Sequence, residues 1–133
     1  MNIIPESHLD LLNDDKKAFL YLATLMADGT PQVTPVWFNT DGTYILINTA
    51  EGRVKDHNMR ARPEVTLCIV DPANPYRYIQ IRGKVVEYVK AGADDHIDAL
   101  SFKYHGVPKY QSRQPGEKRI IFKIKPIKVD AHG

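Results

Sequence analysis

Apolar and polar residues alternate along much of this chain, with the period of two that is typical of half-buried β-strands. The alternation is clearest at 77–88, RYIQIRGKVVEY, where Ile79 and Ile81 fall on one face and Gln80 and Arg82 on the other. Similar alternations, or short continuous apolar runs, predict further strands at 18–27, 31–39, 43–49, 65–71 and 119–129. The pattern therefore predicts about six strands.

Turn residues indicate how the first strands are connected. Asp28-Gly29 and Asp41-Gly42 each separate two predicted strands, and Asp-Gly is a strong signal for a tight hairpin turn. The first three strands are therefore predicted to form an antiparallel meander. Because most of the strands have one polar face, closing the sheet into a barrel is the economical way to remove its free edges.

Three segments carry helical signals. A short opening helix is predicted after Pro5, capped by Ser7. The basic segment 53–62 is predicted to be helical or irregular, because Pro63 resists its continuation. A further helix is predicted at 93–106, where apolar residues recur near helical spacing.

The totals are those of an ordinary globular protein. With 133 residues, 43% of them hydrophobic, the chain is predicted to form one domain, 1–133, around a single core. Lys plus Arg number 18 and Asp plus Glu number 16, so the net charge of +2 gives no general attraction for nucleic acid. Any anion-binding site must therefore be local.

Several features favour a cytoplasmic location. The single cysteine, Cys68, excludes an internal disulfide and lies in an apolar run, where it is predicted to be a small buried hydrophobe. The start of the chain lacks the basic and apolar regions of a signal peptide. No apolar run approaches the roughly 18 residues that cross a bilayer, so no membrane span is predicted.

Motifs for self-contained catalysis are absent. The sequence has no GxGxxG, GxxxxGK[ST] or GxSxG, which argues against dinucleotide-fold, P-loop and nucleophile-elbow chemistry. No two of its histidines lie at i, i+3 or i, i+4, so no metal site is predicted. No set of catalytic side chains stands out, and if the chain is an enzyme, a cofactor is expected to supply the reactivity.

The basic segment is the strongest candidate for a binding site. Arg53, Lys55, Arg60 and Arg62 follow directly after the predicted strand 43–49. The first helical turn would point unpaired backbone N–H groups beyond the end of that strand, which suits an anion. The charges could equally belong to a solvated helix, and spacing alone leaves both interpretations open.

Neighbouring residues extend the anion-site interpretation. Thr49 can supply a hydroxyl, and Asn58, three residues beyond Lys55, can share a helical face with it. Pro35 interrupts its predicted strand, which indicates an edge strand, a bulge or a backbone that faces a ligand. Trp37 would project to the same side as Pro35, either as an apolar wall or as part of the core.

These residues resemble a known family. The stretches GTPQVTPVWF and ILINTAEGRVKDHNMRARPEV are similar to the pyridoxamine 5′-phosphate oxidase-like superfamily of split β-barrels, and more narrowly to its branch of reductases dependent on coenzyme F420, a deazaflavin. The resemblance covers residues 14–90, and the order of elements agrees through residue 129. It implies a mainly β protein with flanking α-helices, a six-stranded antiparallel split β-barrel like the FMN-binding ones.

The resemblance also implies a homodimer with two cofactor sites in clefts between the subunits. The contacts that it implies within one subunit are Thr34, Pro35 and Val36 along the tricyclic ring, Asn48 and Thr49 beside the ring and ribityl chain, and Arg53, Lys55 and Asn58 at the phosphate. Trp37 belongs to the same expected site as an apolar wall. From the second subunit, the residues expected to reach in are Tyr76, Arg77 and Tyr78.

The implied activity is hydride transfer from the reduced deazaflavin to a small electron-poor organic acceptor, without an obligatory catalytic side chain. The proton would come from solvent or from Tyr78. The chain lacks the basic and histidine cluster near the C-terminus that binds the substrate phosphate in pyridoxamine phosphate oxidases, which argues against vitamin B6 oxidation. The longer acidic tail of a deazaflavin would favour the additional basic residues Arg60 and Arg62.

Other functions remain open at this stage. FMN as the cofactor is the main alternative, followed by a non-catalytic protein that binds a flavin or haem. A protein-interaction or nucleic-acid module is a further class, and a nucleic-acid module would bind with a steep salt dependence.

Overall fold

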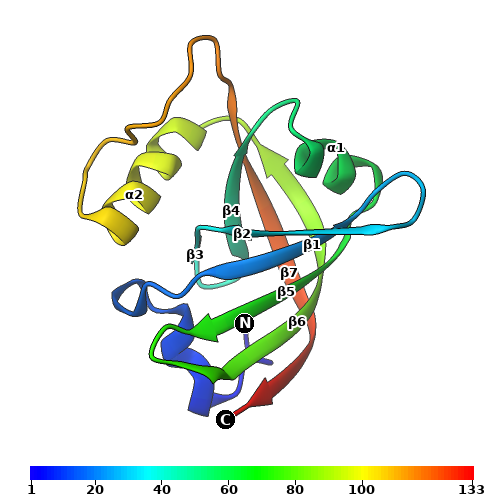
Figure 1. Cartoon of the computed structure of the whole chain (residues 1–133), viewed down its shortest axis with the longest axis vertical. Coiled ribbons are helices and arrows are strands. Elements are labelled where there is room, and N and C mark those ends of the chain that lie inside the picture. The colour runs from blue at the N-terminus through cyan, green and yellow to red at the C-terminus, as the bar shows by residue number, and fades with distance from the viewer.

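The computed structural model describes all residues, 1–133, and consists mainly of β-strands (Figure 1). The strands are β1 (Leu20–Leu25), β2 (Pro31–Val36), β3 (Phe38–Thr40), β4 (Ile45–Ala50), β5 (Glu64–Asp71), β6 (Asn74–Val89) and β7 (Arg119–His132). The α-helices are α1 (Val54–Ala61) and α2 (Ala93–His105), and the 3-10 helices are η1 (Glu6–Leu12) and η2 (Asp14–Lys16).

All strands belong to one antiparallel sheet in the order β2-β1-β5-β6-β7-β4-β3. The two edge strands, β2 and β3, are consecutive in the chain and are separated only by Trp37. The sheet must therefore curl until its two edges meet at this residue, which gives the half-open barrel seen in Figure 1. The mainly β, antiparallel split-barrel fold predicted from the sequence is confirmed.

The structure corrects the predicted number and pairing of strands. The predicted strand 31–39 is broken at Trp37, so the sheet has seven strands and not six. The first strands do not form a meander, because β2 pairs only with β1, and β3 pairs only with β4. Each Asp-Gly turn does close a hairpin, but the break sends the two hairpins to opposite edges of the sheet. Pro35 lies on the edge strand β2, in agreement with one of its predicted roles.

The core lies inside the curled sheet and forms one cluster of 20 buried hydrophobic residues. Alternate residues of each strand point inward, and Phe38 and Phe122 are among the largest that are fully buried. Cys68 lies on the other face of β5 and is only half-buried, so its predicted burial in the core is wrong. Alternation places it outside, because its neighbours Leu67 and Ile69 point inward.

Local signals explain the ends of α1. Gly52, with φ +92°, reverses the chain after β4, and its backbone N–H donates to Oδ2 of Asp56 at 2.9 Å. Such a contact satisfies an N–H group near the helix start. At the other end Arg62 is extended, with φ −135° and ψ 95°, as expected for a residue before Pro63.

The opening helix is present, but its predicted cap is wrong. Pro5 occupies the N-cap position of η1, and no side chain caps this helix. Ser7 lies inside the helix, where its hydroxyl donates to Nδ1 of His8 at 2.8 Å. His8 in turn donates from Nε2 to the carbonyl of His132 at 2.7 Å, which ties the start of the chain to the end of β7.

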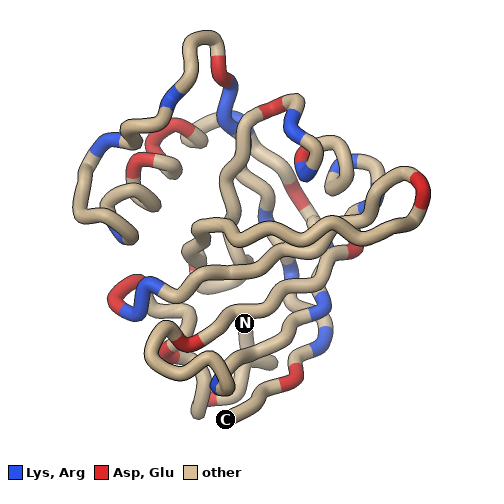
Figure 2. The backbone as a smooth tube through the Cα atoms, in the orientation of Figure 1, with Lys and Arg blue, Asp and Glu red and all other residues tan.

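Helix α2 connects β6 to β7 and packs against β7 and β4 (Figure 1). It lies beside the seam, because Tyr104 of α2 stacks on Trp37. It ends at Gly106, whose φ of 70° suits the left-handed C-cap that glycine adopts without strain. No helix has the length and apolar character needed to cross a membrane. Acidic and basic residues are interspersed over the chain, as Figure 2 shows, so charge is concentrated only locally.

Candidate functional site

A cavity of about 250 Å³ opens where β2 ends, between the start of α1 and helix α2. Its lining residues come from several segments that are distant in sequence: Phe19, Pro35, Val36, Trp37, Asn48, Arg53, Lys55, Ile97, Tyr110 and Arg119. The break at Trp37 brings the end of the β1–β2 hairpin to this point. Strand β7 brings Arg119, because Arg119 pairs with Ala50 at the end of β4.

The cavity collects positive charge. Arg53, Lys55 and Arg119 all line it, and no carboxylate does. Lys55 is partly buried and its ammonium makes no hydrogen bond or ion pair within the chain. Burial, and then the nearby charges of Arg53 and Arg119, lower the pKa of Lys55 below its usual value of 10.5. A bound anion would relieve this repulsion, so the cavity is electrostatically prepared for one.

One carboxylate, that of Glu117, holds two of the cations from beside the cavity. Oε1 of Glu117 contacts the guanidinium of Arg119 and lies 3.8 Å from Nη2 of Arg53. Burial disfavours this carboxylate, but the backbone N–H of Gln114 at 2.8 Å and the Arg119 guanidinium outweigh burial and lower its pKa. Glu117 therefore stays ionised and neutralises part of the charge, while Lys55 remains without a partner.

Asn48 is fixed by a hydrogen-bond network from α2. Its amide nitrogen donates to the carbonyl of Ala93 at 2.9 Å and to Nδ1 of His96 at 3.0 Å. Its amide oxygen accepts from Nε of Arg119 at 2.8 Å. Burial and then the charge of Arg119 lower the pKa of His96 to about 4, so the ring is neutral at pH 7 and Nε2 donates to Oδ1 of Asn39 at 2.8 Å. The network orients Arg119 along the cavity wall.

Aromatic rings form the other wall. Trp37 stacks on Tyr104 with ring centres 5.3 Å apart and an angle of 12° between the planes, and Tyr104 stacks on Phe19 at 5.3 Å and 21°. Tyr110 approaches Trp37 edge-on at 6.0 Å. The Tyr104 hydroxyl donates to the carbonyl of Ala18 at 2.6 Å, and burial raises the pKa of this hydroxyl. The aromatic lining adjoins the cations, because the guanidinium of Arg119 lies 5.3 Å from the ring centre of Tyr110.

Half of the residues that the sequence indicated are brought together here. They are Pro35, Val36, Trp37, Asn48, Arg53 and Lys55. Their contact with a cofactor stays a prediction, but the backbone places all of them around one cavity.

Three others from the same part of the sequence lie outside the cavity. Thr34 precedes it on β2. Thr49 points to the core side of β4, where its hydroxyl is buried without a hydrogen-bond partner. Asn58 is buried, and its amide donates to Oγ1 of Thr24 at 3.1 Å and to Sδ of Met26 at 3.3 Å. A phosphate contact by Asn58 is therefore a prediction that these hydrogen bonds do not favour.

The residues expected to reach in from a second subunit lie near the β5–β6 turn. Tyr76 is largely exposed, and Tyr78 stacks on His132 with ring centres 5.1 Å apart. Arg77 is engaged within its own chain, with contacts to Asp10 at 2.6 Å and to Asp71 at 3.0 Å. None of the three lines the cavity of its own chain, and their role across an interface stays a prediction.

Sequence reasoning missed four lining residues: Phe19, Ile97, Tyr110 and Arg119. Arg119 carried a weak signal, because a charged residue opens the apolar run of the last strand. Tyr110 lies in a polar loop, and Ile97 resembles any core-facing residue of a helix. Only the pairing of β7 with β4 and the packing of α2 bring these residues to the site.

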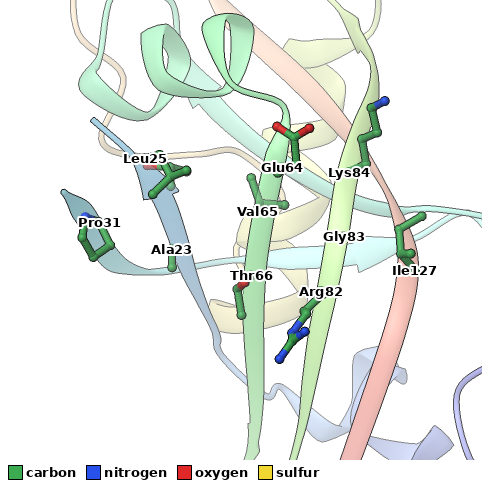
Figure 3. A pocket seen from close by; sticks show the side chains of 11 residues that line it. Ala23, Leu25, Pro31, Glu64, Val65, Thr66, Arg82, Gly83, Lys84 and Ile127 are labelled. Atoms are coloured by element: carbon green, nitrogen blue, oxygen red, sulfur yellow. The ribbon is translucent and has the colours of Figure 1, made fainter. Parts of the chain in front are cut away.

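A second and larger hollow, of about 550 Å³, lies on the outer face of the sheet (Figure 3). Its floor crosses β1, β5 and β6, with Ala23, Val65 and Gly83 near the middle and Leu25 and Ile127 at the sides. Arg82 and Lys84 are its cations and Glu64 its carboxylate. It is an open apolar groove, without the aromatic wall or the unpaired buried cation of the first cavity.

Comparison with known families identifies the family of this chain. Residues 4–133 match the sequence model of the family described as pyridoxamine 5′-phosphate oxidase. This chain belongs to that family. The membership agrees with the split barrel described above.

Solved structures give the same fold. The chain is 31% identical to an F420 reductase, with a TM-score of 0.82 over 96% of this chain and 98% of that one. A conserved hypothetical protein from Mycobacterium tuberculosis is 20% identical, with a TM-score of 0.74 over 98% and 85% of the two chains. The heme storage protein HutZ from Vibrio cholerae is 15% identical, with a TM-score of 0.67 over 96% and 94%. The last two likenesses show the fold alone.

Proposed function

We propose that this protein is a reductase that binds coenzyme F420, the deazaflavin, in the cavity at the seam. The observation that carries the proposal is the unpaired, partly buried Lys55, which lines one cavity together with Arg53, Arg119 and the rings of Trp37 and Tyr110. A phosphate on a planar ring system has the chemistry that such a cavity would accept. Support for the deazaflavin comes from the F420 reductase that is 31% identical over nearly the whole chain.

The cations would hold the phosphate in complementary ways. Arg53 offers a planar fork of donors, and its side chain is 49% exposed, so it can turn toward a ligand. Lys55 offers a point charge that no other group uses. Arg119 is almost fully buried and is fixed by Asn48 and Glu117, so it would act as a stationary charge behind them.

The remaining lining residues would hold the ring. Pro35 and Val36 are at the end of β2, where the edge strand has no partner on its outer side, and Trp37 and Tyr110 supply an apolar surface. When bound, the reduced deazaflavin supplies a hydride to an electron-poor double bond of a small acceptor. The chain's own part is to orient the two molecules and exclude water. Solvent is the proton source in this proposal unless a second subunit brings its Tyr78 to the site.

The size of the cavity supports a homodimer. Pockets that bury a small ligand usually measure roughly 300–1,000 Å³, and one chain supplies about 250 Å³. The outer face of β1 and β2 is rich in exposed apolar side chains, including Tyr21 and Val33, and Tyr21 pairs with the cavity residue Pro35. A second copy on this face and the groove of Figure 3 would cover the open side of the site.

A pair of binding titrations on the purified protein tests the proposal. One uses the deazaflavin coenzyme and the other FMN, and ligand fluorescence is followed at physiological salt. Tight deazaflavin binding with weaker FMN binding would support the reductase and would justify a screen of acceptors with the reduced coenzyme.

Other results of the same titrations would redirect the assignment. A preference for FMN would move the protein to a flavin-dependent function. Binding of neither ligand would sink the proposal, since the three cations would then have no ligand. Light scattering at the same concentrations gives the oligomeric state, and a monomer that binds cofactor tightly would contradict the shared site.

A further inference from the structure

A further cavity, of about 500 Å³, lies between helix α2 and the 3-10 helix η2, and we call it the η2 cavity. It shares no lining residue with the cavity of Arg53, Lys55 and Arg119, which is called the cationic cavity from here on. Its volume is in the range of roughly 300–1,000 Å³ that suits small ligands. Its lining residues are Asp14, Asp15, Lys17, Ala99, Phe102, Lys103 and Gly106.

Lys103 is the only buried lysine of the chain, and 3% of its side chain is exposed. Its Nζ donates to the carbonyl of Phe38 at 2.6 Å and lies 3.4 Å from Oδ1 of Asp14. Nζ is also 4.1 Å from the ring centre of Phe38 and 5.0 Å from that of Tyr104. A positive charge on this nitrogen is therefore stabilised by a carbonyl, a carboxylate and two aromatic rings.

These surroundings suit a nucleophilic amine. Burial lowers the pKa of Lys103 below its usual value of 10.5, and the charge of Asp14 offsets this only in part. More of this amine is therefore neutral at a given pH than for an exposed lysine. A desolvated lysine is the side chain that forms Schiff bases with carbonyl compounds.

The same surroundings suit the product of that reaction. A protonated Schiff base keeps the positive charge of the ammonium and one N–H group. It can therefore keep the hydrogen bond to the carbonyl of Phe38 and the contacts with the two rings that now hold the ammonium. Asp14 can move the proton, because its carboxylate is close to Nζ and its side chain is 65% exposed.

The lining indicates the shape and charge of the ligand. Ala99, Phe102, Lys103 and Gly106 follow the i, i+3, i+4, i+7 spacing of one helix face, a strip of roughly 10 Å at 1.5 Å per residue. Ala99 and Phe102 supply apolar surface along it. Two carboxylates and two ammonium groups line the cavity, so they give no net attraction for a charged ligand. An uncharged, extended apolar molecule fits best.

We propose that Lys103 forms a Schiff base with an uncharged aliphatic aldehyde, whose chain lies along the α2 face of the η2 cavity. Asp14 accepts a proton from the ammonium, and the lone pair of Nζ then bonds to the carbonyl carbon as the C=O π pair moves to oxygen. That oxygen leaves as water, with two protons that came from the nitrogen. Ammonium and aldehyde thus give iminium and water, with charge conserved and no oxidant or reductant consumed.

Reductive trapping tests the proposal on the full-length protein without any cofactor. The probe is hexanal with sodium cyanoborohydride, and peptide mapping by mass spectrometry follows each lysine separately. The reference in the same molecule is Lys109, whose side chain is 76% exposed. Lys103 is expected to be alkylated at least tenfold faster than Lys109. Alkylation of Lys103 at the rate of Lys109 or below would overturn the proposal.

A matched pair of variants tests the cavity. Ala99→Phe fills it from an exposed position of α2, and Ala91→Phe makes the same change at an exposed residue that does not line it. Alkylation of Lys103 should slow at least tenfold in Ala99→Phe and stay unchanged in Ala91→Phe. Equal rates in the two variants would contradict binding in this cavity. Thermal melting confirms that both are folded.

Two further probes need no variant. Hexan-1-ol has the same chain without the aldehyde, so an excess should slow the alkylation of Lys103 and leave that of Lys109 unchanged. Equal slowing at both lysines, or at neither, would remove the cavity from the reaction. Glyoxylate is a small anionic aldehyde, and faster trapping of Lys103 by glyoxylate than by hexanal would overturn the uncharged class. None of these outcomes depends on the proposed function.

Discussion

The two ends of helix α1 carry the same charge in opposite surroundings. At the first turn, Arg53 and Lys55 line the cationic cavity, and Lys55 has no partner. At the last turn, Arg60 is paired with Asp56 at 2.6 Å and with Glu51 at 3.0 Å. Its guanidinium also lies 4.6 Å from the ring centre of Tyr88.

Arg62 is engaged in the same way as Arg60. Its Nε donates to the carbonyl of Leu25 at 2.7 Å, and Nη2 donates to Oδ1 of Asn58 at 3.3 Å. A cation with partners can bind a new anion only by giving up contacts that it already has. A cation that is partly buried and unpaired gains from the same anion without that loss. The difference teaches that the partners of a charge, and not its presence in a basic segment, mark a binding site.

The largest expected effect comes from removing the unpaired cation. Lys55→Ala should weaken binding of the deazaflavin about 100-fold, because a charge-assisted contact to phosphate is worth about 1.5–3 kcal/mol. The free energy of unfolding should change little, since Lys55 makes no contact that folding requires. Isothermal titration and thermal melting measure the two effects, with Arg60→Ala as the control from the same helix. Equal affinity in Lys55→Ala would remove this residue from the phosphate site.

A pH series probes the same cation without removing it. Burial and the neighbouring guanidiniums lower the pKa of Lys55 in the free protein, and a bound phosphate should raise it again. The complex therefore holds more protons than the free protein in this window, so affinity should fall as pH rises through the lowered pKa, by at most about tenfold per pH unit.

The control for the pH series is Lys55→Arg, which keeps its charge throughout. Dissociation constants measured from pH 7 to pH 10 should diverge between the two proteins as the wild type weakens. If the dissociation constants of the two proteins changed with pH in parallel, ligand binding would not depend on the protonation of Lys55.

Most of the elements could be predicted from the sequence, and six of the twelve indicated residues lie around one cavity. Alternation and short apolar runs located every strand segment, although 31–39 was predicted as one strand and forms two, and Pro63 correctly ended α1, because these signals are local. The break at Trp37 was not visible, since neither glycine nor an additional turn residue marks it. The strand order could therefore not be predicted, because it depends on which edge of the sheet each of the two hairpins joins.

The same reason limited the site. Arg53 and Lys55 could be singled out from a basic segment, but nothing local distinguishes them from Arg60 and Arg62. The distinction depends on long-range packing. The pairing of β7 with β4 places Arg119 at the cavity. The carbonyl that accepts a hydrogen bond from Arg62 belongs to Leu25, at the end of β1.

Arg60→Ala tests the other end of the comparison. Its loss leaves Asp56, which is buried, with only the N–H of Gly52 as a partner. Because the guanidinium itself is 32% exposed, the free energy of unfolding should fall by only about 1 kcal/mol. Urea denaturation measures this, and the deazaflavin affinity should stay within about twofold of the wild type. If Arg60→Ala lost much affinity for the deazaflavin and no stability, Arg60 would be a binding cation and not a structural one.

The smallest effect is expected for Arg62→Ala. Its contacts are to neutral oxygens near the surface, so the variant should lose about 0.5 kcal/mol of stability and no affinity. The informative measurement is a pair of titrations, with the deazaflavin and with FMN, because only the deazaflavin carries a long acidic tail. If Arg62→Ala weakens deazaflavin binding and leaves FMN binding unchanged, the tail reaches the last turn of α1. Arg62 would then contribute to both folding and cofactor binding. The proposed distinction between binding cations at the start of α1 and structural cations at its end would be wrong.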